Sequence, residues 1–257
     1  MTVSPELREY AETPDRFSTI ESEIVTRYAD DRVCIVEGPT WAAVSGIHTD
    51  DVEALLGEVR GRVSAGKDPM WWIGPSSRPG DLHERLQELG LREPRDRTPL
   101  LHALVATAPP PDPQPGIDVT QVETFDDFVA AQEVRWAAFE TPPERRERER
   151  PHLGEFFADA TRTGVPVSFV ARLDGRAAAT AMSIPSPRGV FLIGGCTAPW
   201  ARGRGLYHAL VRARWDDAVQ RGTPALVTHA KPDTSLPILS RLGFVEICRV
   251  RRLEDVR

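Results

Sequence analysis

Apolar residues occur along the chain in short runs and in helical stripes that alternate from one end to the other. In the first part, four short apolar runs predict strands at residues 33–36, 41–44, 70–73 and 100–106. Apolar residues spaced three or four apart predict helices at residues 51–59 and 81–89. Residues 1 to about 31 also read as helical, with Ser18 as the N-cap and Glu21 completing a capping box. Such a mixture is typical of an α/β protein.

The pattern breaks at residues 109–116, where five of seven consecutive residues are proline. Proline cannot continue a helix or lie in a central strand, so this segment is predicted to be an extended, semi-rigid spacer. We expect it to link an N-terminal domain, residues 1–108, to a C-terminal domain, residues 117–257.

The C-terminal domain repeats the alternation of strands and helices. Strands are predicted at six apolar runs, residues 117–122, 167–173, 177–184, 190–197, 225–229 and 245–249. Helices are predicted at residues 126–139, 153–160, 206–220 and 236–241. The charge run at residues 144–150 is predicted to form a solvated helical face. We therefore expect a sheet with helices packed against it.

A glycine-rich turn, Arg202-Gly203-Arg204-Gly205, joins the strand at 190–197 to the following helix. The N–H groups at a helix start have no partner within the helix and carry partial positive charge, which suits a phosphate. Glycine allows a left-handed backbone and the close approach of an anion, and the two arginines add full positive charge. The turn is therefore either a phosphate cradle or an ordinary strand-to-helix loop with two solvated arginines.

The strand, the turn and the helix together resemble motif A of the GNAT superfamily, the acetyl-CoA-dependent N-acyltransferases. The strand ends in Thr197-Ala198-Pro199 and the R-G-x-G turn follows, as in that family. Residues 235–244 read S-L-P-I-L-S-R-L-G-F, which is similar to the family's last helix and its Leu-Gly-Phe turn. The resemblance covers the chain from about residue 117 onward. It implies a mixed sheet with helices on both faces, in which the strands on either side of the motif helix splay apart.

The resemblance also implies where acetyl-CoA would bind as cosubstrate. In the family, the loop amides bind the pyrophosphate and the end of the preceding strand binds the pantetheine arm. The corresponding cofactor-binding residues here are Gly195, Cys196, Thr197, Arg202, Gly203, Arg204, Gly205, Leu206, Tyr207 and Ser235. Two positions depart from the family pattern, Trp200 in place of Gln or Arg and Tyr207 in place of a small residue, but neither removes the backbone amides. Tyr207 either packs, edges the cofactor or supplies a proton, and Ser235 either touches the cofactor or caps its helix.

Acyl transfer to an amine needs a polarised carbonyl and groups that exchange protons. In the family a strand amide polarises the carbonyl. Here that amide lies near Gly195 or Cys196, unless the paired glycines form a simple bulge. The family's usual tyrosine acid is replaced by Leu239, and the strand has no glutamate base. By position, His229 and Glu140 are the candidate catalytic residues, although His229 also reads as a structural histidine and Glu140 as a cap or surface charge.

A faint internal repeat relates the two domains. Aligning Gly90 with Gly243 also pairs Pro79 with Pro232, together with three further identical pairs, although such matches also arise by chance. Tandem members of the GNAT superfamily often carry a degenerate first copy, and the first domain here has no R-G-x-G turn. The resemblance therefore implies two tandem GNAT-like domains, of which the first is structural or forms a wall of the acceptor site.

Composition narrows the functional classes further. The net charge of −6 over 257 residues argues against a general nucleic-acid binder. No apolar run approaches the roughly 18 residues of a membrane span, and the first residues lack the features of a signal peptide. Three scattered cysteines and six histidines without ligand spacing predict no disulfide framework and no metal site. We expect a cytoplasmic protein without a membrane or nucleic-acid partner, and the oligomeric state stays open.

These observations lead to one functional prediction and its alternatives. The prediction is an N-acetyltransferase that moves an acetyl group from acetyl-CoA to a primary amine of a small molecule, with a protein N-terminus or lysine as other acceptors. The missing tyrosine and glutamate prompt the main alternative, a non-catalytic CoA-binding regulatory or scaffold protein. A different phosphate ligand at the loop is a third possibility.

Overall fold

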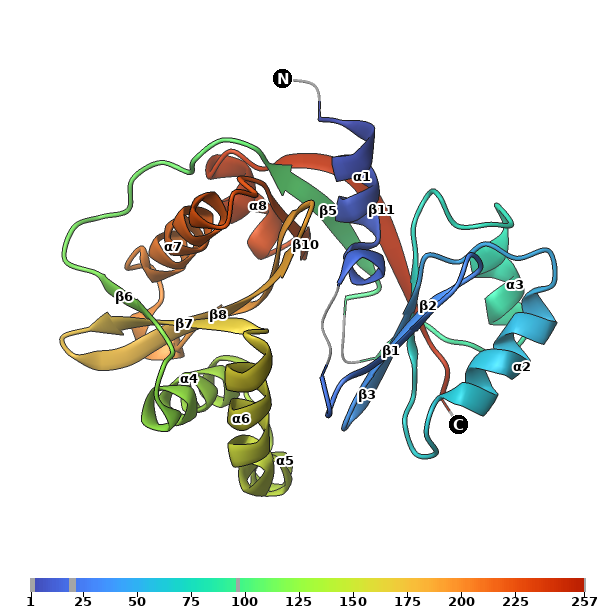
Figure 1. The fold of residues 1–257 in the computed structure, drawn as a ribbon, viewed down its shortest axis with the longest axis horizontal. Helices are drawn as coiled ribbons and strands as arrows, with labels where there is room; N and C mark the ends of the chain where they lie inside the picture. Colours follow the sequence, from blue (N-terminus) through green and yellow to red (C-terminus); the bar gives the residue numbers. More distant parts are fainter. Residues whose placement is uncertain (1–2, 19–21, 96–97, 257) are drawn as a thin grey trace. The chain divides into compact units, whose positions relative to one another are not determined.

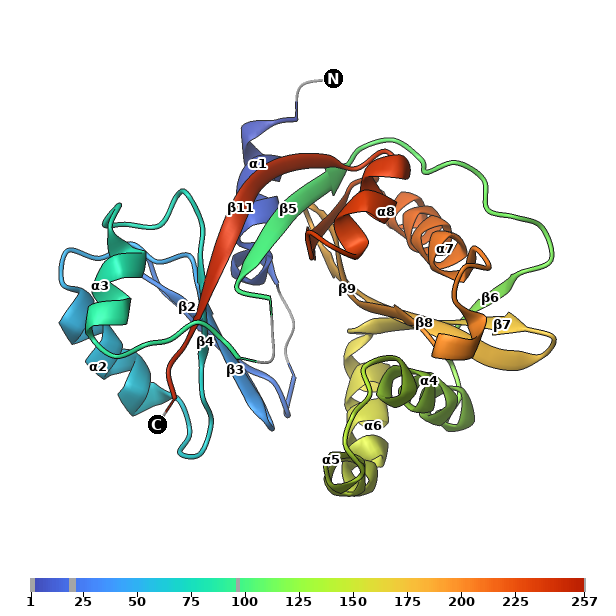
Figure 2. The ribbon, with the colours of Figure 1, turned by 180° about the vertical axis from the view of Figure 1, so that it is seen from behind.

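The computed structural model describes residues 3–18, 22–95 and 98–256, which Figures 1 and 2 draw in colour. The chain starts with helix α1 (Pro5–Glu12), a 3-10 turn η1 (Pro14–Phe17) and strand β1 (Thr26–Ala29). The continuous helix predicted for residues 1 to about 31 is therefore wrong, because Pro14 disfavours helical backbone in the residue before it and α1 stops at Glu12. Glu21 of the predicted capping box lies outside the described residues.

The chain forms two compact units. Unit 1 consists of Met1–Val105, His229–Ser240 and Val245–Arg257. Unit 2 consists of Ala106–Thr228 and Arg241–Phe244. The units follow the sequence-based division except near the ends of its two parts. Residues 229–240 and 245–257 group with unit 1, and residues 106–108 group with unit 2.

Six strands form the sheet of unit 1, in the order β1-β2-β3-β4-β11-β5. Besides β1, these strands are β2 (Cys34–Gly38), β3 (Trp41–Ser45), β4 (Met70–Ile73), β5 (Leu100–Ala106) and β11 (Val245–Glu254). Strands β3 and β4 run parallel, and helix α2 (Val52–Arg62) connects them. Helix α3 (Leu82–Glu88) follows β4 and lies beside α2, on the same side of β2 and β3 (Figure 1). Apolar residues of both helices are buried with Trp71 in one core, as their helical spacing predicted.

Strand β11 explains why the end of the chain belongs to unit 1. It pairs antiparallel with β4 through Arg251–Glu254 and antiparallel with β5 through Val245–Arg251. Leu253 is fully buried in the core of unit 1, and Asp255 forms an ion pair of 2.7 Å with Arg60 of α2. Long-range strand pairing of this kind leaves no local signal, so the sequence predicted the strand but not its partners.

Five strands form the sheet of unit 2, in the order β10-β9-β8-β7-β6. They are β6 (Asp118–Gln121), β7 (Val167–Leu173), β8 (Arg176–Ser186), β9 (Gly189–Thr197) and β10 (Leu226–Ala230), whose last two residues belong to unit 1. Strands β6 to β9 are antiparallel to one another, whereas β10 runs parallel to β9. The sheet is therefore mixed, as predicted.

Helices cover both faces of this sheet. Helices α4 (Phe125–Ala138) and α6 (Leu153–Thr163) lie on one face, and α7 (Leu206–Gln220) lies on the other (Figures 1 and 2). The remaining elements are α5 (Pro143–Glu149), the 3-10 turns η2 (Arg150–His152) and η3 (Pro199–Ala201), and α8 (Ser235–Arg241). The predicted arrangement, a mixed sheet between two helical layers, is confirmed.

The element order is the same in the two halves of the chain. The first half runs β2-β3-α2-β4-α3-β5, and the second runs β8-β9-α7-β10-α8-β11. In each half the strand before the long helix is parallel to the strand after it. Gly90 and Gly243 follow the short helices with φ of 105° and 90°, values that favour glycine. This correspondence matches the faint sequence repeat.

Candidate functional site

The turn between β9 and α7 has the backbone of an anion cradle. Gly203 and Gly205 both have φ of 77°, in the left-handed region where a side chain is disfavoured. Gly205 is the N-cap of α7, and among the described residues no side chain caps this helix start. A Cβ built on Gly203 would meet open space. The first N–H groups of α7 are therefore left for a ligand or solvent.

The start of α2, the corresponding helix of the first half, is capped by a side chain. Asp51 is the N-cap of α2, and its carboxylate accepts a hydrogen bond of 3.0 Å from Ala54 N. A carboxylate at this place satisfies an N–H group and repels an anion. Gly46, which precedes α2, has the guanidinium arm of Arg16 in the space where its Cβ would lie. Of the two helix starts, only the one at α7 is open.

Two arginines flank the open helix start. Arg202 and Arg204 are both exposed, and the ion pairs of the described residues include neither. Arg202 Nη2 donates a long hydrogen bond of 3.4 Å to the carbonyl of Ala138. Both side chains are thus available to a phosphate, which they would bind with charge-assisted hydrogen bonds.

The proline-rich segment lies along α7. His208 Nε2 donates to the carbonyl of Pro111 at 2.7 Å, and Arg212 binds the Asp112 carboxylate. The Oε1 atom of Gln114 lies 3.4 Å from the position of a Cβ on Gly205. The segment predicted to be an extended spacer is thereby fixed to the helix whose start it borders.

Strand β9 carries a bulge next to this helix. Cys196 pairs with Thr180 and Ile193 pairs with Met182, so Gly194 and Gly195 together face the single residue Ala181 of β8. Gly194 has φ of 60°. The bulge interpretation of the paired glycines is confirmed, and a bulge re-aims backbone groups at strand edges and active sites.

The bulge coincides with the end of pairing between β9 and β10. The parallel register starts at Val190 with Leu226 and ends at Leu192 with Thr228. Thr228 Oγ1 donates to the carbonyl of Leu192 at 2.9 Å and closes this paired part. Beyond Leu192, β9 stays paired with β8, but its opposite edge is no longer paired with β10.

On the α7 face of the bulge, an aromatic ring and a buried guanidinium meet Gly195. A Cβ on Gly195 would lie 2.8 Å from Tyr207 Cε2 and 3.6 Å from Arg214 Nη2. Arg214 is 1% exposed, and it donates to the carbonyls of Leu210 at 2.9 Å and Met182 at 3.4 Å. Burial lowers the pKa of Arg214 and raises the pKa of Tyr207, so the tyrosine keeps its proton at neutral pH.

On the α4 face of the bulge, Gly194 meets Met182 and a second guanidinium. A Cβ on Gly194 would lie 3.1 Å from Met182 Cε and 3.8 Å from Arg135 Nη2. Cys196 lies nearby, and burial raises the pKa of its thiol to about 11 although the Arg135 charge opposes this shift. The thiol therefore stays protonated at neutral pH. The two arginines approach the bulge from the two helical layers.

Most predicted cofactor residues lie on one continuous stretch from the bulge to the first turn of α7. Gly195, Cys196 and Thr197 belong to β9, whereas Leu206 and Tyr207 open α7. Leu206 is buried in the core of unit 2, so its contribution is its backbone. Ser235 has a local role, since its Oγ accepts a hydrogen bond of 2.8 Å from Lys231 N before α8.

The candidate base His229 has structural contacts in unit 1. Its Nε2 bonds to the carbonyl of Ala11 at 2.9 Å, and its ring stacks on Trp72 with centroids 5.3 Å apart. Burial, and to a lesser extent the charge of Arg252, lowers the pKa of His229 to about 4. These contacts account for the residue without a role in proton transfer.

The other candidate, Glu140, ends a helix. It is exposed and has φ of 51°, directly after the C-cap Phe139 of α4. Its N–H donates to the carbonyl of Ala137 at 3.4 Å. This is the left-handed residue that commonly terminates a helix, which agrees with the capping interpretation. Leu239, at the family's tyrosine position, is 1% exposed.

Sequence reasoning missed Arg135 and Arg214. A signal was available, because Arg214 lies four residues after Leu210 and four before Ala218, both of which are buried. Arg135 likewise follows the buried Ala131 by four residues. A charged residue on the inward stripe of a helix has to find an acceptor or a ligand.

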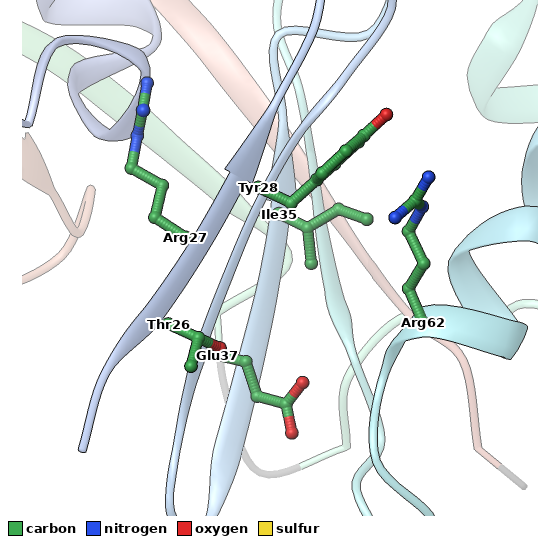
Figure 3. A pocket seen from close by; sticks show the side chains of 6 residues that line it. All are labelled: Thr26, Arg27, Tyr28, Ile35, Glu37 and Arg62. Carbon is green, nitrogen blue, oxygen red and sulfur yellow. The ribbon is translucent and has the colours of Figure 1, made fainter. Parts of the chain in front are cut away.

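The structure has a hollow in unit 1, lined by residues outside unit 2 (Figure 3). It measures about 260 Å³, and its lining consists of Thr26, Arg27, Tyr28, Ile35, Glu37 and Arg62. Its charged side chains already have partners in unit 1. Arg62 pairs with Glu58, Glu37 pairs with Lys67, and Arg27 donates to two backbone carbonyls. We assign no chemistry to it.

Comparison with solved structures decides what this fold is. A GCN5-related N-acetyltransferase from Kribbella flavida superposes with a TM-score of 0.70 at 15% identity, over 98% of this chain and 96% of that one. A GCN5-related N-acetyltransferase from Sphaerobacter thermophilus gives 0.53 at 18% identity, over 87% and 80%. The fold is a GNAT fold. A tandem GNAT protein from the clavulanic acid biosynthesis pathway matches at 0.59 with 11% identity, over 98% of this chain and 87% of its own.

The resemblance to the GNAT superfamily that the sequence suggested is thus confirmed at the level of the fold. No family model matches the sequence. No curated protein matches it either. Within the described residues, no group of three or more His, Cys, Asp or Glu side chains could hold a metal ion. The helices of the described residues include none long and apolar enough to cross a membrane.

Proposed function

We propose that this protein is an acetyl-CoA-dependent N-acetyltransferase whose acceptor is a primary amine of a small molecule. The observation that carries the proposal is the open start of α7, with Gly203 and Gly205 in the left-handed region, one short turn after the bulge of β9. A phosphate binds at such a helix start, and a thioester attached to it would extend along the free edge of β9.

The residues of this site fit the cosubstrate. The N–H groups of the turn and of the first turn of α7 would bind the pyrophosphate, and Arg202 and Arg204 would add charge-assisted hydrogen bonds. Acetyl-CoA supplies the acetyl thioester. We infer that a backbone N–H at Gly195 or Cys196 would polarise its carbonyl, because Gly195 lies in the bulge of β9 and Cys196 directly follows it.

Tyr207 is our candidate for the proton donor to the leaving thiolate. Its ring lies on Gly195, and its pKa is raised by burial, so it carries the proton that a general acid needs. We give His229 and Glu140 no step, because structural contacts account for both. The amine then has to arrive unprotonated, with its proton passing to solvent.

The degenerate role of the first half is part of the same proposal. Asp51 caps α2, so we infer that this half binds no phosphate and has a structural role. A cytoplasmic location and the absence of a nucleic-acid partner stay predictions from composition.

Calorimetric titration of acetyl-CoA tests the proposal directly. Wild type is expected to bind with micromolar affinity, roughly 8 kcal/mol. Gly205→Glu, which puts a carboxylate at the cradle, should weaken binding at least about tenfold. Gly222→Glu is the matched control, because Gly222 has φ of 75°, against 77° for Gly205, and lies past the other end of α7. Loss of binding in both variants, or no binding to folded wild type, would contradict the proposal.

A second candidate function is a CoA-binding protein without catalysis. Leu239 fills the place of the family's usual acid and is 1% exposed, which favours this alternative. Release of CoA from acetyl-CoA across a panel of amines separates the two, because a binding protein would give no turnover with any acceptor.

A further inference from the structure

The α4 face of the bulge holds a cation for which the described residues supply no counter-charge. The Nη2 and Cζ atoms of Arg135 lie 3.8 Å and 3.9 Å from the position of a Cβ on Gly194. Its Nε is buried and has no hydrogen-bond partner among the described residues. Burial lowers the pKa of Arg135, because a charged guanidinium is less stable when it is removed from water.

The nearest acidic groups do not neutralise Arg135. Cys196 is the first of them, but its thiol stays protonated because burial raises its pKa to about 11. Glu149 is the second, and its two oxygens accept hydrogen bonds of 2.7 Å from Trp136 Nε1 and 2.7 Å from Arg145 Nε. An ion pair between Arg135 and a carboxylate is therefore absent from the described part of unit 2.

Other arginines of unit 2 that are buried or partly buried have acceptors for their guanidinium groups. Arg146 donates to the carbonyl of Thr141 at 2.6 Å, and Arg172 binds the carboxylate of Asp127. Arg214, on the opposite face of the same bulge, donates to two backbone carbonyls. Arg135 thus differs from these three arginines in having no acceptor among the described residues. Partial burial makes its charge costly, and a ligand that supplied an acceptor would lower that cost.

We propose that Arg135 binds the carboxylate of the acceptor, and that the acceptor is an amine with a carboxylate close to it, such as an α-amino acid. This inference rests on the proposed function and names its substrate class. A planar guanidinium binds a carboxylate through two parallel hydrogen bonds, whereas a lone positive charge would repel a polyamine.

The geometry places the amine beside the reacting bond. Arg135 lies over Gly194, and the backbone that would polarise the thioester begins at the next residue, Gly195. Consecutive Cα atoms are about 3.8 Å apart, and an α-amino nitrogen is two bonds from the carboxylate carbon. A carboxylate held by Arg135 therefore brings an α-amine within reach of the carbonyl, which gives the orientation that acyl transfer needs.

The experiment compares L-amino acids with their α-amides as acceptors of acetyl-CoA. Each pair differs in the carboxylate alone. We expect wild type to prefer the acids at least about tenfold in kcat/KM, and Arg135→Gln to abolish the preference by raising KM for the acids. Arg135→Lys should restore part of it. Arg148→Gln is the control, since Arg148 is exposed on α5 and should leave the preference unchanged.

Two further measurements keep this inference separate from the proposed function. Calorimetry of acetyl-CoA should give the same affinity for wild type and Arg135→Gln. Thermal shifts with the same amino acids and amides, without acetyl-CoA, report carboxylate binding even if no acetyl transfer occurs. If the amino acids raise the melting temperature of wild type but not of Arg135→Gln, the inference is supported even without acetyl transfer.

Three results would overturn the inference. Wild type could use or bind amides as well as acids. Arg135→Gln could lower kcat equally for acids and amides, which would place the guanidinium at the thioester oxygen. Arg135→Gln could also abolish acetyl-CoA binding while keeping its fold by circular dichroism, which would make Arg135 a cofactor residue.

Discussion

Tyr207 lies directly against Gly195, since a Cβ on Gly195 would come within 2.8 Å of Tyr207 Cε2. The first turn of α7 and the bulge of β9 are therefore in contact at a position where only glycine fits. We expect Gly195→Ala to lower the free energy of unfolding by about 1–3 kcal/mol, because the ring or the strand has to shift. Urea denaturation measures this change.

The matched control for this substitution is Gly154→Ala on α6. Nothing lies within 4 Å of a Cβ on Gly154, so alanine there should be neutral or add up to about 1 kcal/mol. In a Tyr207→Ala background, Gly195→Ala should cost less unfolding free energy than it does in wild type, because the ring that it would meet is gone. A Gly195→Ala protein as stable as wild type would show that this contact does not constrain the bulge.

Tyr207 itself is expected to matter for turnover more than for binding. Tyr207→Phe keeps the ring and removes the proton, so we expect kcat to fall by about 100-fold, as for other general acids. The acetyl-CoA affinity should stay within about twofold of wild type, a change of about 0.4 kcal/mol. Steady-state kinetics with the best acceptor provide the test. An unchanged kcat would remove Tyr207 from the mechanism and favour direct protonation by solvent.

Arg214 is expected to be a structural residue of unit 2. Replacing it with alanine deletes a side chain that is 1% exposed and leaves the Met182 carbonyl without its donor. We expect a loss of about 3 kcal/mol in unfolding free energy. Arg221→Ala, which removes a surface pair with Asp217 at the end of the same helix, should cost no more than about 1 kcal/mol. Equal losses of unfolding free energy in the two variants would mean that burial of Arg214 does not stabilise unit 2.

His229 should make stability fall on acidification. Its folded pKa of about 4 is below the ordinary 6.5, so between these values the unfolded chain binds a proton that the folded protein does not. Its contribution to the unfolding free energy is therefore fully present above pH 6.5 and decreases towards pH 4, by roughly 3 kcal/mol.

His229→Gln provides the comparison for this pH effect. Asp15, whose pKa burial raises to about 6, changes stability in the opposite direction, so the difference between wild type and variant is the quantity to measure. We expect urea unfolding to show that the unfolding free energy falls more between pH 7.5 and pH 4.5 for wild type than for His229→Gln. Parallel losses would mean that the ring is protonated as easily in the folded protein as in the unfolded chain.

Asp51 is the side-chain cap that the start of α2 has and the start of α7 lacks. Asp51→Ala removes the cap of α2 and should cost about 1 kcal/mol of stability. It should leave acetyl-CoA binding unchanged, in contrast to Gly205→Glu. Thermal unfolding and calorimetry on the same samples provide both numbers. Tighter or doubled binding of acetyl-CoA by Asp51→Ala would show that the first half has kept a phosphate site.

The elements near the site could be read from the sequence because their signals are local. The strand before the turn, Gly203, Gly205 and the stripe from Leu206 to Ala218 follow from periodicity and glycine placement alone. The same reasoning failed for residues 1 to about 31, where one proline outweighed the apparent helical pattern. It also predicted the strand at residues 245–249 but not its partners β4 and β5, because pairing partners are set by contacts distant in sequence.

The sequence by itself determined the fold and the open, glycine-lined start of α7. Both depend on the order of elements and on backbone freedom at named positions. Tertiary structure alone decided the surroundings of the bulge. It packed His229 against Trp72, used Glu140 to end a helix, and brought Arg135 and Arg214 to opposite faces of two adjacent glycines. Such contacts join residues from different elements, and the burial that gives each charge its energetic weight exists only once those elements have packed.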